Sequence, residues 1–249
     1  MNKIIKIVGV SKKFNTIKGE IEALKSISFD INEGEFIAIV GNSGCGKSTL
    51  LSIIAMLDNC TNGNVYYGIS KPIIGYMLQE DALFDHLTVL QNVELGLKVL
   101  GKCSEDNKQF VFDLLKKYNL YDYKDKYPKE LSGGMRQRVA LIRTLAIKPD
   151  ILLLDEPFSA LDYTTRLSVA DDVYRIIKNY GKTTIIVTHD IEEAISMADR
   201  VIILSKSPAT VKKIIDIELD SEDVPSKKRN NISFSRYREE ILKELDVIV

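Results

Sequence analysis

A glycine-rich segment between an apolar run and a helical run constrains this chain more than any other feature. Nine consecutive residues fit the pattern G-x-x-x-x-G-K-[ST] and its following Thr: Gly41, Asn42, Ser43, Gly44, Cys45, Gly46, Lys47, Ser48 and Thr49. The run at 36–40 suits a buried strand, and the run at 50–57 suits a helix. Average composition would produce the four fixed positions by chance in about one in a hundred such chains, so an ordinary strand-to-helix turn is the weaker interpretation.

Such a loop has a specific physical use. Its backbone N–H groups point inward, and the helix that follows directs the positive end of its dipole to the same place. Polyphosphates bind there. We predict that residues 41–49 bind nucleotide, with Lys47 reaching the β and γ phosphates and the Ser48 hydroxyl binding Mg²⁺.

Strand-like and helix-like segments alternate along the chain. Runs at 35–40, 151–154, 183–188 and 201–204 are nearly continuous in Val, Ile and Leu, which indicates strands buried on both faces. Runs at 4–10 and 21–31 alternate more and, with a short strand at 65–67, predict an antiparallel edge sheet. The fold class is therefore α/β with a largely parallel sheet.

Helical patterns replace the strands between residues 80 and 147, at 88–100, 106–118 and 134–147. We expect a helical subdomain at 80–147, inserted into a core formed by residues 1–79 and 148–215. The polar stretch 216–231 predicts a linker, and 235–245 predicts a last amphipathic helix. The chain, 1–249, is then a single domain that ends in a linker and helix at 216–249.

Two adjacent acids follow the apolar run that begins at Ile151. Asp155 ends the strand, at the sheet edge where ligands of open α/β sheets collect. We predict that Asp155 binds the metal and that Glu156 takes a proton from a water attacking the γ phosphate. Adjacent acids at a strand end are otherwise often solvated or cap a helix, but Pro157 fixes the turn after them.

Two further polar residues follow predicted strands. His189 leaves the strand at 183–188, at the same sheet edge as Asp155, where its imidazole would bond the γ phosphate and hold the water. A lone histidine is otherwise a packing residue. Gln79 follows a short strand at 74–78; its amide is suited to ligate Mg²⁺ and to reorient without moving charge, although glutamine there is commonly a surface residue.

A second phosphate-binding element precedes the helix at 134–147. Ser132, Gly133 and Gly134 form a cap whose exposed N–H groups suit a phosphate; the plain alternative is a helix cap. This element would lie far from Lys47 in the same chain. It makes sense when a second copy of the chain completes the site, which predicts a dimer with nucleotides between its subunits.

Together these residues resemble the ATP-binding cassette (ABC) ATPases, whose signature motif looks like residues 131–135. The resemblance covers nearly the whole chain. It implies a RecA-like P-loop NTPase core with an antiparallel edge sheet and an inserted helical subdomain, and a head-to-tail dimer that encloses ATP and Mg²⁺. It further implies that Phe14 stacks on adenine, that Gln79 and His189 lie at the site of hydrolysis, and that residues around Asp162 form the D-loop.

The importer branch is the part of this family that the chain resembles, by its segments 161–166 and 190–194. Met135 and the continuation 136–143 are similar to the nitrate, sulfonate and taurine importer ATPases. That similarity implies a membrane-spanning permease and, through it, a solute-binding protein. The group usually shows Leu-Pro-Trp after its glutamine, whereas this chain reads Ala-Leu-Phe-Asp-His-Leu-Thr at 82–88, in the segment that meets the membrane subunit.

Composition limits the partners and the compartment. Lys and Arg number 34 against 35 acids, a formal charge of -1, which provides no overall field for nucleic acid. The apolar stretches fall short of the roughly 18 residues of a membrane span, and no export signal is visible at the start. Three unpatterned cysteines favour a reducing compartment. We expect a peripheral protein on the cytoplasmic face of the membrane.

Two other functions compete with import. One is a soluble ABC ATPase that acts on a macromolecule; the chain has neither the coiled-coil heptads of the DNA-repair type nor the paired cassettes of the ribosome type, so the iron–sulfur-assembly type stays open. The other is a cassette that binds ATP and only scaffolds a complex. Glu156 and His189 argue against lost chemistry.

Overall fold

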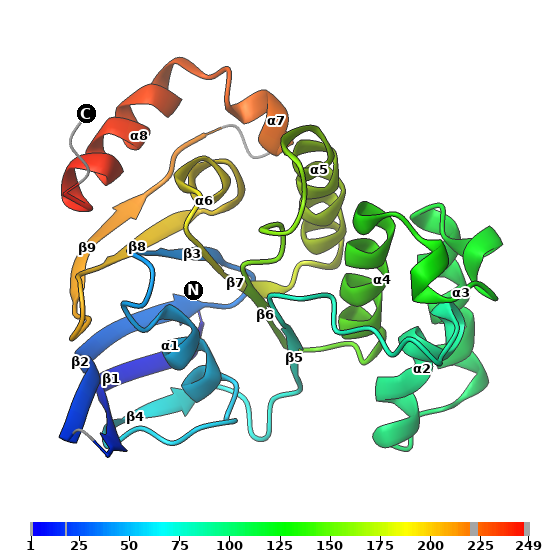
Figure 1. Cartoon of the computed structure of the whole chain (residues 1–249), viewed down its shortest axis with the longest axis horizontal. Coiled ribbons are helices and arrows are strands. Elements are labelled where there is room, and N and C mark those ends of the chain that lie inside the picture. Colours follow the sequence, from blue (N-terminus) through cyan, green and yellow to red (C-terminus); the bar gives the residue numbers. More distant parts are fainter. Residues whose placement is uncertain (1, 18, 220–223, 247–249) are drawn as a thin grey trace.

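The computed structural model describes residues 2–17, 19–219 and 224–246 and contains two β-sheets (Figure 1). The larger sheet has the strand order β5-β6-β7-β3-β8-β9, with bounds Ile74–Met77, Ile151–Asp155, Thr183–Thr188, Phe36–Val40, Arg200–Leu204 and Val211–Asp216. Its first five strands are parallel, and β9 is antiparallel to β8. The smaller sheet is antiparallel, with the order β2-β1-β4 and bounds Gly19–Asn32, Lys3–Thr16 and Asn62–Tyr67.

The helices are α1 (Lys47–Ile54), α2 (Val89–Val99), α3 (Glu105–Lys117), α4 (Gly133–Ala146), α5 (Tyr163–Tyr180), α6 (Ile191–Met197), α7 (Pro225–Lys228) and α8 (Ile232–Glu244). Two 3₁₀ turns, Tyr121–Tyr123 and Pro128–Glu130, connect α3 to α4. Helices α2, α3 and α4 lie together at one end of the molecule, with α4 beside α5 (Figure 1). The predicted α/β fold with an antiparallel sheet and a helical insert is confirmed.

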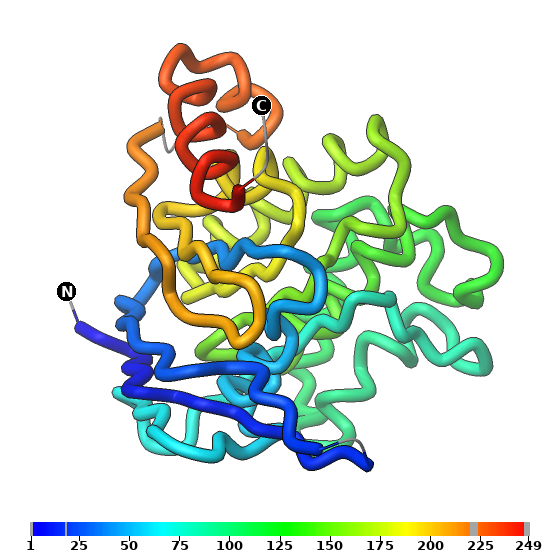
Figure 2. The backbone as a smooth tube through the Cα atoms, turned by 60° about the vertical axis from the view of Figure 1, so that its left-hand side comes forward, coloured from blue at the N-terminus to red at the C-terminus, as the bar shows by residue number. Residues whose placement is uncertain are grey.

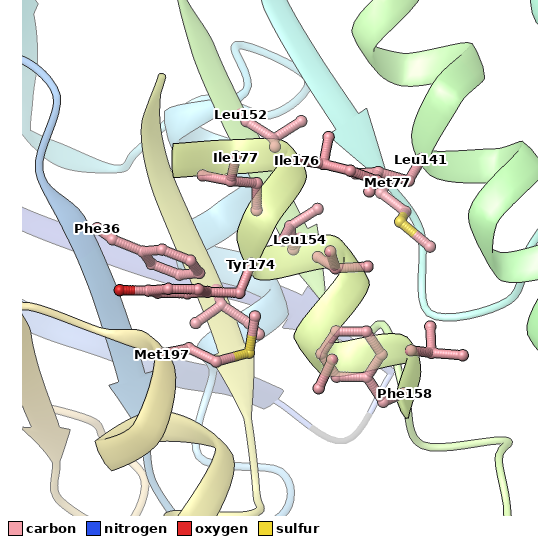
Figure 3. Packing of buried hydrophobic residues seen from close by; sticks show 14 of the residues in the cluster. Phe36, Met77, Leu141, Leu152, Leu154, Phe158, Tyr174, Ile176, Ile177 and Met197 are labelled. Atoms are coloured by element: carbon pink, nitrogen blue, oxygen red, sulfur yellow. The ribbon is translucent and has the colours of Figure 1, made fainter. Parts of the chain in front are cut away.

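Two hydrophobic clusters bury the two faces of the parallel sheet. One packs Ala38, Leu154 and their neighbours under α4, α5 and α6. In it the rings of Phe36 and Tyr174 stack with centroids 6.4 Å apart (Figure 3). The other fills the space between the two sheets around α1, with Ile37 and Ile39 at its centre. Burial on both faces explains why the central strands are mostly aliphatic.

Polar caps fix where the helices begin. In the described part of the chain, six of the helices have an N-cap side chain that accepts a backbone N–H: α2 to α6, and α8. Helix α1 instead begins at Gly46, which has no side chain to offer. The first N–H groups of α1 are therefore left to an external acceptor.

The C-terminal segment returns across the molecule to pack on α5 and α6 (Figure 2). The backbone N–H and hydroxyl of Ser226 both donate to the Asp171 carboxylate, at 2.9 and 2.5 Å. Lys228 is buried, with its ammonium 2.8 Å from the Tyr174 hydroxyl. Arg229 pairs with Glu192 of α6 at 2.9 Å. Helix α7 is thus anchored by polar contacts rather than by an apolar face.

The structure departs from the sequence-based prediction in several elements. The predicted linker at 216–231 begins at the last residue of β9, contains the helical turn α7, and includes residues 220–223, which lie outside the described residues. Strand β9 and helices α5 and α6 were not assigned. The predicted strands at 4–10 and 21–31 are parts of longer strands, and they form the predicted antiparallel sheet with β4. The last helix runs from Ile232 rather than from 235.

Candidate functional site

Residues 41–49 connect β3 to the first turn of α1, and glycine is required inside this loop. Gly44 and Gly46 have φ angles of 74° and 107°, in the left-handed region that glycine tolerates. A Cβ on Gly46 would also lie 2.8 Å from Leu24 Cδ2 and 3.2 Å from Ala23 O. Both the backbone angle and the close approach of β2 therefore exclude a side chain at Gly46.

The loop holds its lysine in place. Lys47 is 5% exposed, and its ammonium donates to the carbonyl oxygens of Gly41 and Asn42 at 2.9 and 3.3 Å. Cys45 is also buried, and burial raises the pKa of its thiol. The cation and the uncapped start of α1 together suit this loop to an anionic ligand.

A cavity of about 390 Å³ lies against this loop. It is lined by Ser43, Gly44, Gly46, Lys47, Ser48 and Thr49 of the loop and by Ala23, Gln79 and Glu156. The sequence-predicted phosphate loop, glutamine and carboxylate thus share one cavity. Gly41, Asn42 and Cys45 are not part of its lining; Gly41 and Asn42 contribute through their carbonyl contacts with Lys47.

Asp155 at the end of β6 is fixed by two hydroxyl groups. Ser48 Oγ donates to Asp155 Oδ1, and the Tyr76 hydroxyl donates to Asp155 Oδ2, both at 3.1 Å. Burial, with a smaller effect of the Glu156 charge, raises the pKa of Asp155, and the Ser48 and Tyr76 bonds partly offset this rise. Burial, and secondly the Asp155 charge, raise the pKa of Tyr76 to about 12.

The donor set fits Mg²⁺. Ser48 and Asp155 place a hydroxyl and a carboxylate oxygen side by side, and Mg²⁺ is commonly held by one or two such groups together with substrate phosphates and water. Within the described residues no group of three or more His, Cys, Asp or Glu side chains forms a complete metal site. Ligands from a bound triphosphate would complete the coordination.

Glu156 directly follows Asp155 and occupies an unusual backbone conformation. Its φ is 44°, and its N–H donates to Val187 O at 2.8 Å. A left-handed backbone is costly for a residue other than glycine, and neighbouring contacts must hold it there. The turn directs the Glu156 side chain into the phosphate-loop cavity.

Two predicted residues converge on one oxygen of Glu156. His189 Nδ1 lies 3.0 Å from Glu156 Oε2, and the Gln79 amide lies 3.5 Å from the same oxygen. The His189 side chain is 53% exposed, against 18% for Glu156, so the packing interpretation of this histidine is wrong. Gln79 faces the Glu156 carboxylate and lines the same cavity as Ser48, and its role toward Mg²⁺ stays a prediction.

Ser132 caps α4, as predicted, and accepts the N–H of Met135 at 3.3 Å. The following glycines pack against the next segment of the fold. A Cβ on Gly134 would lie 3.1 Å from the γ carbons of Thr165 and Val169, and one on Gly133 would lie 3.3 Å from Leu161. None of Ser132, Gly133 and Gly134 lines the phosphate-loop cavity.

Phe14 lies near the end of β1, opposite Ile21 of β2. Its ring is 39% exposed, and the Lys12 ammonium lies 5.0 Å from the ring centroid. The alternative of a core phenylalanine is therefore wrong, and the ring is available at the surface. It does not line the cavity around Lys47.

Tyr76 belongs to this site through its bond to Asp155, and the sequence predicts no role for it. In a short strand a tyrosine is commonly a packing residue. Outside the cavity lining, Arg166 connects two loops: it donates to Leu161 O at 3.0 Å and pairs with Asp190 at 3.3 Å. The only sequence signal for Tyr76 is its place three residues before Gln79.

A phosphate loop, a strand that ends in Asp155 and is followed by Glu156, and a histidine directly after the neighbouring strand define a P-loop nucleoside triphosphatase. Residues 24–159 match the ABC transporter family. The chain is 46% identical to the uncharacterized ABC transporter ATP-binding protein YtlC of Bacillus subtilis, over 95% of this chain and 94% of that protein. The chain belongs to the ABC transporter family, as one of its ATP-binding and ATP-hydrolysing subunits.

Two other similarities extend this result. The aliphatic sulfonates import ATP-binding protein SsuB of Bacillus cereus is 38% identical over 97% of this chain and 96% of that protein. The ATP-binding cassette MJ0796, solved as a dimer in a post-hydrolysis state bound to ADP and Pi, aligns with a TM-score of 0.74 at 34% identity, over 86% of this chain and 99% of MJ0796. These names favour transport over an iron–sulfur-assembly role. Across the described residues, no helix is both long and apolar enough to span a bilayer.

Proposed function

We propose that this chain is the energising subunit of an importer for a small solute and sits on the cytoplasmic face of the membrane. Two copies would close head to tail on two ATP molecules, and hydrolysis would reopen them. The observation that carries the proposal is the cavity in which Lys47, Gln79 and Glu156 meet, with His189 on the same carboxylate as Gln79.

The chemistry follows from the positions of these side chains. Lys47 and the N–H groups at the start of α1 bind the β and γ phosphates. Glu156 accepts a proton from the attacking water, while His189 and Gln79 hold its Oε2 and orient the carboxylate. Bound Mg²⁺, held by Ser48 and Asp155 and reached by Gln79, would neutralise charge on the phosphates.

A second copy completes the site. Ser132, Gly133 and Gly134 present the start of α4, which suits the γ phosphate of the opposite subunit. Phe14, exposed at the end of β1, would stack on the adenine ring. These placements make each ATP a shared ligand, so hydrolysis is coupled to opening of the dimer.

An apolar groove gives the place where a permease would dock. It has a volume of about 460 Å³ and runs between α2, α4 and the end of β5. Its lining includes Leu78, Phe84, Val99 and Leu100, whose exposed fractions run from 46% to 78%. Exposed apolar surface of this kind is typical of an interaction site.

Residues 81–88, which form one wall of this groove, are hydrogen-bonded to both α2 and α4. Asn92, fully buried in α2, donates to the carbonyls of Phe84, Leu87 and Thr88. From α4, Arg136 pairs with Asp81 at 2.9 Å, and Arg143 donates to the carbonyls of Asp81 and Ala82. A movement of the permease bound in this groove would therefore be transmitted through these contacts to α4, whose first turn contains Gly133 and Gly134.

The solute that this importer would carry is a sulfonate-like or nitrate-like oxyanion. Support comes from the similarity to the aliphatic sulfonate importer subunit and from the signature continuation at 136–143. The departure at 82–88 falls on the permease groove rather than on the nucleotide site. It therefore concerns which permease is recognised and leaves the hydrolytic chemistry as described.

The test of the hydrolytic roles is Glu156→Gln, with Glu105→Gln on the exposed face of α3 as the matched control. We expect ATP binding to persist in Glu156→Gln, turnover to fall at least about 100-fold, and ATP to hold the protein as a dimer in light scattering. Glu105→Gln should behave as the wild type. Normal turnover in Glu156→Gln would remove this residue from the proposed role.

The transport assignment is tested with the same variant. Tagged Glu156→Gln protein is purified from its native cells in mild detergent with ATP, and the co-purifying chains are identified by mass spectrometry. A stoichiometric multi-span membrane protein supports the importer, and a solute-binding protein found with it supplies a ligand to screen against sulfonates and nitrate. A soluble partner without any membrane chain would overturn the proposal in favour of iron–sulfur assembly.

A further inference from the structure

Tyr76 occupies a position that none of the predicted roles uses. It lies in β5, the edge strand of the parallel sheet, opposite Leu153 of β6. Its ring is half-buried and packs against the apolar cluster between the two sheets. Its neighbours Gly75 and Met77 face the other side of the strand, where Gly75 meets Thr144 and Pro149.

The hydroxyl of Tyr76 is hydrogen-bonded to the carboxylate of Asp155. It donates to Oδ2 at 3.1 Å, while the other oxygen, Oδ1, accepts from Ser48 at 3.1 Å. Ser52, one turn after Ser48 on α1, opposes the rise in the pKa of this phenol. The bond to Asp155 therefore ties the phenol to the end of β6, and it fixes the direction of the carboxylate oxygen that Ser48 does not contact.

We propose that Tyr76 is a positioning residue for Asp155, fixing the carboxylate so that Oδ1 and the Ser48 hydroxyl face a divalent cation together. The proposal rests on the metal-binding role proposed above for Asp155 and Ser48. Without the phenol, the carboxylate would rotate more freely about its last side-chain bond. Mg²⁺ requires nearly ideal octahedral geometry, so this freedom would weaken binding.

Groups that orient a metal ligand commonly change metal affinity by about 10- to 100-fold. Tyr76→Phe removes the one oxygen atom that makes this contact and retains the ring that packs between the sheets. We expect Tyr76→Phe to need about tenfold more of the divalent cation for half-saturation of the metal site. Because the Tyr76 hydroxyl bonds to Asp155 and the residue does not line the phosphate-loop cavity, nucleotide binding without a cation should not change.

Tyr67→Phe is a matched control. Tyr67, at the end of β4, is half-buried like Tyr76, and its hydroxyl donates to Ile54 O at 2.6 Å. It also packs on the same apolar cluster between the sheets. Its removal deletes a comparable hydroxyl at the opposite end of α1, away from Asp155, and reports what loss of a phenol does to the fold alone.

The experiment titrates Mn²⁺ into the full chain with a non-hydrolysable ATP analogue and follows free Mn²⁺ by electron paramagnetic resonance. Affinity of a fluorescent ATP analogue in EDTA and the Mg²⁺ dependence of turnover are measured in parallel. We expect Tyr76→Phe to weaken Mn²⁺ binding about tenfold, to retain nucleotide affinity in EDTA, and to recover turnover at saturating Mg²⁺. Tyr67→Phe should match the wild type in all three measurements.

Two outcomes would overturn the inference: unchanged Mn²⁺ affinity in Tyr76→Phe, or an equal loss in Tyr67→Phe. Asp155→Asn separates this failure from failure of the proposed metal site. If Asp155→Asn abolishes Mn²⁺ binding while Tyr76→Phe leaves it unchanged, the inference alone is wrong. If Asp155→Asn has no effect on Mn²⁺ binding, the metal site itself is misplaced, and the inference fails with it.

Discussion

Replacement of the buried Glu193 by glutamine should change how the stability of this protein depends on pH. Glu193 lies in the first turn of α6 with its side chain 4% exposed. It accepts the Thr188 hydroxyl at 2.8 Å and lies 3.8 Å from Arg166 Nε, with Asp190 and His189 nearby. Burial, and secondly the Asp190 charge, raise its pKa from 4.5 to about 7, against the opposing effects of Thr188, Arg166 and His189.

The sign of the effect follows from this shift. A carboxyl whose pKa is higher in the folded than in the unfolded protein stabilises the fold fully below the unfolded value and loses that contribution as pH rises through the folded value. The loss therefore falls between about pH 4.5 and 7. At 1.36 kcal/mol per unit, the wild type should lose about 2 to 3 kcal/mol of this contribution between pH 5 and pH 8.

Glutamine retains an oxygen for Thr188 and cannot ionise. For a chain of this size, a loss of about 2 to 3 kcal/mol corresponds to roughly 5 to 10 °C in melting temperature. The wild type should show this loss between pH 5 and pH 8, and Glu193→Gln should not. The melting temperature of the variant minus that of the wild type should therefore rise by this amount. Calorimetry at both pH values measures it, with Glu105→Gln, on the exposed face of α3, as the control. Melting temperatures of wild type and Glu193→Gln that change in parallel over this range would refute the reasoning.

Two further changes test the loop and the antiparallel sheet. N-ethylmaleimide should modify the buried Cys45 slowly and thereby block ATP binding, and Mg-ATP should protect this thiol but not the exposed Cys103. Mass spectrometry measures the modification of both cysteines. Modification of Cys45 at the same rate with and without nucleotide would contradict the loop assignment. Gly63→Ala should cost at least about 2 kcal/mol, because φ is 81° and a Cβ would overlap the backbone of Gly9 and Val8. Gly101→Ala, at φ 65° with open space around it, should lower the free energy of unfolding by about 1 kcal/mol. Equal losses for both variants in urea unfolding would show that the cost at Gly63 comes from the backbone angle rather than from overlap with Gly9 and Val8.

The predictable parts of this molecule are those specified by local sequence. The central strands are mostly aliphatic because both faces are buried, and the loop at 41–49 depends on glycines that its backbone angles require. Asp155, Glu156 and His189 could be placed because parallel strands end at one edge of the sheet. Their convergence, with His189 3.0 Å from Glu156, follows from strand order.

The parts that were missed depend on contacts between distant segments. Strand β9 carries two lysines and a terminal aspartate, and its pairing with β8 determines its structure more than its own composition does. Helix α7 has four residues, which do not form a stable helix alone; it is fixed by Asp171 on α5. Tyr76 acts through a carboxylate 79 positions along the chain, which no local pattern can indicate.

The position of β5 at the margin of the sheet has a mechanical consequence. A strand flanked on both sides is held by two ladders of backbone hydrogen bonds, whereas in the described part of the chain β5 pairs with β6 alone. Strand β3, which leads into the loop at 41–49, lies between β7 and β8 and has two such ladders. Tyr76 and Gln79, which contact Asp155 and Glu156, lie on β5 and just after it, so we expect the proposed hydrolytic groups to shift more easily than the loop at 41–49.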